Sequence, residues 1–395
     1  MMTENSADPD RKLMSAKTAV WVLIFDRYPG DVAYEGLREP HYTGGLTPTT
    51  PLGHDGAFDR LELQSTYFEQ FLLQDVRSRV GVHEVFGSEP AWSALSDVLA
   101  AARQTVSLIR VNADGKAGST QTNCLEMESF FRHSQIPLSA VIELNHPAIS
   151  GVRCDIGSPD PSDGAFSASM VWLEAEVTSV NDPAMEIKQI LDFVLNRLKS
   201  RATTEQPNAV LLVTFRNGDN VVVREPLKSG MAESRLHVPL WIRPSEGHAC
   251  RVQALTGSFD LLPTITTFLG SADAADEASP PDVAQIADLS ERAVVRQFLS
   301  SEPLSLAFLC GAPQVCQDRL LKLRGDGWKA ARTEEFLLVI SESSQSDARE
   351  TASDGDSSEE PSRRLYVKPE DRFNVNDVSK TYATTADELA QRIDQ

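Results

Sequence analysis

The sequence predicts an α/β fold: a doubly wound, mostly parallel sheet flanked by helices, followed by a small C-terminal α+β subdomain. Short apolar runs alternate with segments of helical period through the first two thirds of the chain. The run Ala209–Phe215 is almost continuously apolar, which is typical of a strand covered on both faces. At 395 residues the chain is longer than a typical single domain, which predicts one large domain with an appended subdomain.

Each element predicted for this core follows from a local sequence pattern. Four apolar runs of strand length predict strands, at 18–26, 106–111, 138–144 and 209–215. Helical spacing of apolar residues predicts helices at 58–73, 92–103 and 183–200. Asn181 or Asp182 can cap the last of these helices. Residues 30–56 are rich in Gly, Pro and Thr and are expected to form a long loop.

The predicted domain boundaries follow from composition. Residues 1–17 are expected to be a disordered lead-in, 18–275 the α/β core, and 276–395 the C-terminal subdomain. In that subdomain Phe308-Leu309, 328–340 and 364–367 are candidate strands. Residues 341–362 carry seven acidic residues against one basic and few apolar ones, which predicts a disordered acidic loop.

Charge and cysteine content limit the classes of function. The net charge is −20, with 37 basic and 57 acidic residues, so binding to a nucleic-acid backbone is not expected. The apolar run that starts at Ala19 is too short to span a membrane, and no export signal precedes it. The five cysteines form no CxxC pair, which favours a reduced, cytoplasmic protein.

One stretch identifies the scaffold more clearly than any other. Val238, Leu240 and Ile242 alternate into a strand that Arg243-Pro244 stops. In the following GSFDLLPTITTFLG, Ser258 or Asp260 can cap a helix that ends at Gly270. The sequence of this stretch resembles that of the sulfatase family, which belongs to the alkaline phosphatase-like superfamily. The family's pattern there is roughly V-P-L-I-I-R-x-P followed by V-D-L-L-P-T.

Two C-terminal stretches strengthen this resemblance. Residues 328–338, WKAARTEEFLL, resemble the family's A-V-R-T-x-x-W-K-L-I. Residues 365–377, which begin LYVKPEDR, resemble its E-L-Y-x-x-P-x-D. The similarity therefore extends over most of residues 18–380, although it is dense in only three places.

The resemblance implies a specific constellation of residues in active members. A metal, usually calcium, is held by acids after the first strand and by an Asp with Asn or His after a later strand. The nucleophile is a formylglycine made from the Cys or Ser of C/S-x-P-x-R. A hard dication needs several oxygen ligands and lowers the pKa of the nucleophile, while basic side chains balance the charge of the sulfate.

The metal positions depart from this pattern. The first strand ends in Asp26-Arg27, where the family has two acids, so Arg27 replaces the second. After the strand 209–215, Arg216 and Asn217 stand where the family has Asp and His. Two guanidiniums in place of two carboxylates change the local charge by about four units. We therefore expect calcium binding to be lost, with Arg27 or Arg216 paired to Asp26 where the ion would sit.

The nucleophile motif is absent: neither C-x-P-x-R nor S-x-P-x-R occurs in the chain. Ser78-Arg79 can be what remains of the C-terminal end of this motif. In that case Asp75 stands at the position of the nucleophile. A charged helix end explains these residues equally well. His146, in a His-Pro pair after a strand, and Lys228 correspond to basic groups of the family's site. A lone His or an exposed Lys is more often structural.

Three functions follow from these residues. The first is a catalytically inactive sulfatase-like protein that serves in binding or regulation. The second is a sulfuric-ester or phosphate-ester hydrolase with an altered mechanism, in which Asp75, Asp26 and His146 must converge in one pocket. The third is a metal-free anion-binding protein, in which Arg27, Arg216, Lys228 and His146 hold a sulfated or phosphorylated ligand. The sequence favours the first.

Overall fold

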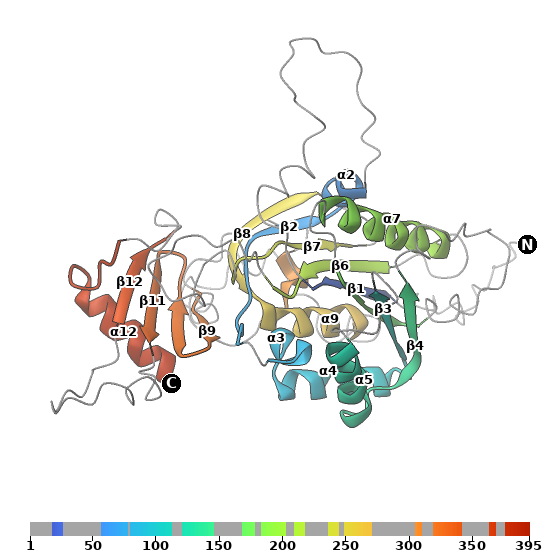
Figure 1. The fold of residues 1–395 in the computed structure, drawn as a ribbon, viewed down its shortest axis with the longest axis horizontal. Helices are drawn as coiled ribbons and strands as arrows, with labels where there is room; N and C mark the ends of the chain where they lie inside the picture. Colours follow the sequence, from blue (N-terminus) through green and yellow to red (C-terminus); the bar gives the residue numbers. More distant parts are fainter. Residues whose placement is uncertain are drawn as a thin grey trace, which may run out of the picture.

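A computed structural model gives the arrangement of the chain (Figure 1). It describes residues 18–26, 57–77, 80–112, 121–145, 168–177, 183–202, 209–217, 236–244, 249–270, 305–309, 319–341, 363–368 and 376–395. The predicted lead-in 1–17, the predicted long loop 30–56 and residues 342–362 of the predicted acidic loop 341–362 lie outside these ranges.

The larger part of the molecule is built on an eight-stranded sheet, in the order β4-β3-β5-β1-β6-β7-β2-β8. Seven of its strands are parallel, and β7 runs antiparallel to both of its neighbours. The strands are β1 (Ala19–Phe25), β2 (Thr66–Leu72), β3 (Val106–Asn112), β4 (Leu138–Asn145), β5 (Met170–Ala175), β6 (Ala209–Phe215), β7 (Leu240–Arg243) and β8 (Cys250–Gly257). The predicted fold class is confirmed.

Central strands are apolar because helices cover both faces of the sheet. Every residue of β1 is buried, and β5 and β6 are buried at all but one position each. In Figure 1, α2 and α7 lie on one face of the sheet and α3, α4, α5 and α9 on the other. These helices are α2 (Ala57–Glu62), α3 (Val82–Phe86), α4 (Glu89–Ala101), α5 (Gln121–His133), α7 (Pro183–Ala202) and α9 (Leu261–Gly270).

A second, smaller sheet lies beside the first, on the left in Figure 1. It is antiparallel, in the order β12-β11-β10-β9, and one of its faces is covered by the helix α12 (Ala383–Asp394). The opposite face buries Leu321, Leu323 and Trp328 against Leu72 and Leu255 of the large sheet. Its strands are β9 (Leu321–Gly325), β10 (Trp328–Arg332), β11 (Phe336–Ser341) and β12 (Arg363–Val367).

The short 3-10 helix η4 (Leu306–Leu309) belongs to the main core. Leu306 is fully buried there, and its backbone amide donates to Thr264 Oγ1 of α9 at 2.7 Å. The prediction of a strand at Phe308-Leu309 was therefore wrong. The chain forms one helical turn beside α9 there.

The predicted helix 58–73 was also wrong, because it combines two elements. The helix α2 stops at Glu62, and the chain then extends into β2, a strand between β7 and β8. Apolar residues at helical spacing continue across both elements. The signal against a helix is local: Thr66, Tyr67 and Phe68 are β-branched or aromatic, as is typical of strands.

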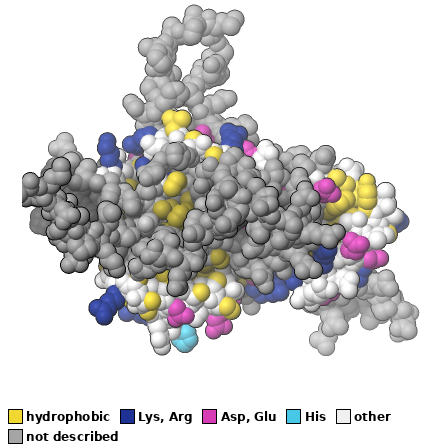
Figure 2. Space-filling model, turned by 180° about the vertical axis from the view of Figure 1, so that it is seen from behind, with side chains coloured by type: hydrophobic (Ala, Val, Ile, Leu, Met, Phe, Trp, Pro, Cys, Tyr) yellow, Lys and Arg dark blue, Asp and Glu magenta, His cyan; other side chains and the backbone are white. Residues whose placement is uncertain are grey.

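Among the described residues, no helix has the length and apolar content to cross a membrane. Figure 2 shows the face opposite to that of Figure 1, where basic and acidic side chains of the described residues are interspersed. Neither sign of charge dominates that part of the surface.

Candidate functional site

The candidate site lies at the edge of the large sheet where its parallel strands end. In open α/β sheets ligands bind outside the carboxyl ends of the strands. At this edge, Asp26 follows β1 and Arg216-Asn217 follow β6, and β1 and β6 are direct neighbours in register. The topology thus brings together residues that are about 190 positions apart in the sequence.

Asp26 is held by the backbone around it. Its amide donates to the Ala175 carbonyl at 2.9 Å, and its Oδ1 accepts from the Val177 amide at 2.9 Å. Both contacts come from the end of β5, the neighbour of β1 on the other side. The side chain is half-buried. One carboxylate oxygen therefore has a structural hydrogen bond to the strand next to it.

Asn217 and Arg216 reach in different directions. The exposed Asn217 donates from Nδ2 to the Asp26 carbonyl at 2.8 Å, which ties the end of β6 to that of β1. Arg216 is half-buried, and its Nη2 donates to the Val80 carbonyl at 3.2 Å. Its guanidinium thus faces the segment just before α3. The expected ion pair of Arg216 with Asp26 is not formed. The alternative, an ion pair of Arg27 with Asp26, concerns a residue outside the described ranges.

Asp75 lies at the other side of this edge, in the segment that leads from β2 to α3. Its side chain is only 7% exposed. Arg77 donates from Nε and Nη2 to both carboxylate oxygens, at 2.6 to 3.1 Å, and its amide donates to Oδ1 at 3.3 Å. The hydrogen bond to Asp75 raises the pKa of Arg77, so the guanidinium keeps its charge.

The remaining predicted site residues are Arg27, Ser78, Arg79, His146 and Lys228, and all lie outside the described residues. The structure brings Asp26, Arg216 and Asn217 to the same edge of the sheet, and of these Asn217 contacts Asp26. Asp75 belongs to the same edge through its segment, because Val80 of that segment accepts the hydrogen bond from Arg216.

Comparison with known proteins identifies the architecture. No protein-family model matches the chain, and no curated protein shows significant sequence similarity to it. Solved structures do match. A protein of the alkaline phosphatase superfamily from Vibrio parahaemolyticus has a TM-score of 0.52 at 13% identity, with 95% of this chain and 88% of that chain covered.

The chain has the alkaline phosphatase-superfamily fold. A Bacteroides thetaiotaomicron protein, described with the metabolism of multiple glycosaminoglycans, matches with a TM-score of 0.54 at 12% identity, over 96% of this chain and 99% of that one. Ps i-CgsB, solved in complex with k-i-k-neocarrahexaose, matches with a TM-score of 0.52 at 11% identity, over 96% and 92%. The predicted sulfatase-like scaffold is therefore confirmed as a fold.

Within the described parts of this fold, no three His, Cys, Asp or Glu side chains are grouped so that they could hold a metal ion. Of the described residues at the predicted metal positions, only Asp26 offers a carboxylate. Arg216 has five donor N–H groups and no acceptor.

Sequence reasoning missed several residues at this edge. Gln74 holds the turn after β8: its amide donates to Ser258 Oγ at 3.1 Å, and its Oε1 accepts from the Phe259 amide at 3.1 Å. Ser258 therefore does not cap the helical segment, whereas the Asp260 carboxylate accepts the Gly257 amide at its start. A Gln between an apolar strand and an Asp has no distinctive pattern, so no sequence signal points to it.

Proposed function

We propose that this chain is a catalytically inactive sulfatase-like protein that uses the carboxyl edge of its large sheet for binding or regulation. The observation that carries the proposal is the position of Arg216. It follows β6, next to the end of β1, and places a guanidinium where the family resemblance implies a metal-binding Asp.

The described residues do not suit calcium. Calcium takes six to eight oxygen ligands, most often from several carboxylates. Here Asp26 has one oxygen bound to the Val177 amide, and the Arg216 guanidinium adds a positive charge at the end of the adjacent strand. A dication between them would be repelled by a group that cannot lose its proton. This supports loss of the metal, and with it loss of the activated nucleophile.

The altered hydrolase has less support. A nucleophilic carboxylate needs a lone pair free to attack, and both oxygens of Asp75 accept hydrogen bonds from Arg77. Its side chain is also nearly buried. This geometry is typical of a structural ion pair.

The anion-binding alternative is favoured by one observation, the half-buried Arg216 at the sheet edge. A guanidinium suits sulfate and phosphate because its parallel N–H groups match two anion oxygens. A sulfated or phosphorylated group is thus the chemical class of ligand that the edge would take.

Turnover of an aryl sulfate, with and without added calcium, tests the inactive state. We expect the rate with the protein to equal the rate without it. Turnover well above background that disappears in Asp26→Ala would overturn the proposal, because it would show a working carboxylate at this edge.

Calorimetric titration with inorganic sulfate tests the anion site. If it exists, Arg216→Ala weakens sulfate binding at least tenfold. Arg251→Ala is the matched control, because Arg251 is an exposed arginine near the opposite end of the sheet, paired with Glu69. No saturable heat, or an equal loss in both variants, would rule the site out.

A further inference from the structure

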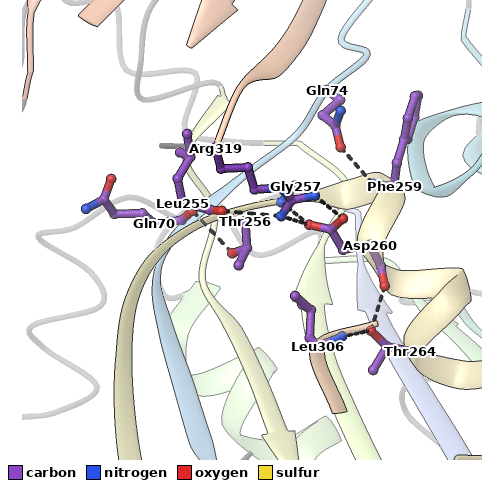
Figure 3. Close-up of polar contacts among 10 residues, drawn as sticks. All are labelled: Gln70, Gln74, Leu255, Thr256, Gly257, Phe259, Asp260, Thr264, Leu306 and Arg319. Carbon is purple, nitrogen blue, oxygen red and sulfur yellow. Dashed lines mark hydrogen bonds and ion pairs between the residues drawn. The ribbon is translucent and has the colours of Figure 1, made fainter. Parts of the chain in front are cut away.

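A buried ion pair joins the two sheets. Arg319 lies just before β9, and Asp260 closes the turn between β8 and α9. Arg319 donates from both terminal nitrogens to the Asp260 carboxylate, whose Oδ2 also accepts from the Gly257 amide at 2.7 Å (Figure 3). The side chains are 2% and 0% exposed. Arg319 also donates to the Leu255 carbonyl at 3.3 Å.

The same joint fixes the segment that carries Asp75. On its core side, Gln74 bonds to Ser258 and Phe259 of the turn that Asp260 closes. On its other side the segment pairs with β9: the Arg324 amide donates to Gln74 O at 2.8 Å, and the Val76 amide donates to Arg324 O at 2.9 Å. Residues 74–76 are thus held between the turn after β8 and the first strand of the small sheet.

Close packing leaves little freedom in this arrangement. Gly257 approaches Gln74 so closely that a Cβ there would lie 2.2 Å from Gln74 Oε1. Gln74 is itself 5% exposed. The turn after β8, residues 74–76 and the strand β9 therefore fit together in one register.

Apolar contacts alone would not set that register. Leu72 and Leu255 meet Leu321, Leu323 and Trp328 across the two sheets, and such contacts are non-directional. A buried ion pair adds little net stability, but its geometry discriminates between alternative packings. The Nε of Arg319 has no hydrogen-bond partner within the described residues, so the guanidinium depends on Asp260 and Leu255 for its remaining hydrogen bonds.

We propose that the Asp260–Arg319 pair is a latch that couples docking of the small sheet to ordering of residues 74–77. When the pair is formed, β9 is placed to bond with Gln74 and Val76, and Asp75 is held with Arg77 at the site edge. When the pair is broken, the apolar contacts persist but the segment loses its fixed partner strand. The small sheet thereby controls the shape of the candidate site.

Amide hydrogen exchange of the full chain tests this latch, with Arg319→Met as the variant. Met keeps the apolar stem and removes the charge. We expect exchange in peptides that cover 72–77 and 320–325 to become at least tenfold faster, while peptides from β1 and β6 keep their protection. Arg363→Ala is the matched control, since it breaks an exposed pair with Asp387 in the same small sheet and should change neither region.

Equal loss of protection across both sheets would overturn the latch, because the pair would then serve global stability only. Unchanged protection at 72–77 would overturn it as well. If Arg319→Met does not fold, Arg319→Lys decides, since Lys keeps the charge but not the two-pronged geometry. Selective loss at 72–77 in that variant supports the latch, and uniform or absent change contradicts it.

Discussion

Two aspartates of this chain lie where a strand of the large sheet ends, and they are engaged in different ways. Asp26, after β1, is half-buried and bonds to a backbone amide, while the nearby Arg216 turns to a backbone carbonyl. Asp260, after β8, is fully buried and meets Arg319 directly. The ion pair is complete at the joint between the sheets, whereas Asp26 and Arg216 do not pair with each other at the site edge.

The two aspartates illustrate the difference between a residue that builds the fold and a residue of the candidate site. Asp260 belongs to the Asp-Leu-Leu-Pro-Thr stretch that resembles the sulfatase family, and its role in the structure is to hold the small sheet. Asp26 and Arg216 stand where the family resemblance implies metal ligands. Under the proposed function, this chain keeps the residues that build the fold, while those that would serve the reaction have been replaced.

The largest effect is expected at the joint. Asp260→Asn removes the negative charge but keeps the size of the side chain, so Arg319 is left buried without a counterion. Removing one partner of a buried pair costs about 3–5 kcal/mol. The free energy of opening at residues 320–325, measured by native-state amide exchange, should fall by that amount, while β1 and β6 keep their protection.

Asp387→Asn is the matched control, because Asp387 is an exposed partner of Arg363, and its loss should be barely measurable. A loss at Asp260 as small as that of the control would show that the joint is no more important than a surface pair.

A smaller effect is expected from adding one methyl group in the same turn. In Gly257→Ala the new Cβ collides with the side chain of Gln74, which must give up its bond to Phe259. Overpacking of this kind costs about 1–3 kcal/mol. Gly270→Ala is the control, since its Cβ would meet nothing closer than 4.0 Å. Thermal melts of both variants check this, and equal melting temperatures would contradict the close fit at the turn.

The smallest effect concerns the far edge of the small sheet. Asp377 is an exposed residue whose slight desolvation by itself raises its pKa, but hydrogen bonds from Ser379 and Leu365 outweigh this and lower the pKa below its ordinary value of 3.8. The ionised form is therefore favoured in the folded state. Its contribution to stability is present above pH 4 and is lost as the pH falls through the lowered pKa.

Asp377→Asn should remove this part of the acid sensitivity and cost at most about 0.5 kcal/mol at neutral pH, because water screens the exposed carboxylate. Urea unfolding at pH 7 and pH 3 measures both. The same pH dependence in the variant and the unsubstituted chain would show that Asp377 does not contribute.

Much of the fold could be predicted from the sequence, because local patterns determine it. The strand 209–215 matches β6, and the predicted helix 183–200 matches α7, since a continuous apolar run and a long amphipathic stretch are strong signals. The strands β5 and β8 were not predicted. β8 begins with the alternation Arg251, Val252, Gln253, Ala254, but an edge strand of this length gives a weak signal.

The site was predictable only in its residue types. The family resemblance placed Asp26, Arg216 and Asn217 at one edge, and the structure brings them there. Their partners were not predictable, because Val177, Val80 and the Asp26 carbonyl act through backbone atoms that any residue possesses. Asp260 does accept the Gly257 amide at the start of the helical segment, as its position predicted. Its ion pair was missed, because its partner Arg319 is 59 residues away.

Calcium titration is the most direct test of the central claim that the edge of the large sheet has lost its metal site. The melting temperature of the chain, measured with calcium from micromolar to millimolar concentrations against a chelator control, should not change. A ligand present at 100 times its dissociation constant would stabilise the folded state by about 2.7 kcal/mol, which a melt detects easily. A rise in melting temperature that saturates at micromolar calcium and disappears in Asp26→Ala would contradict the account.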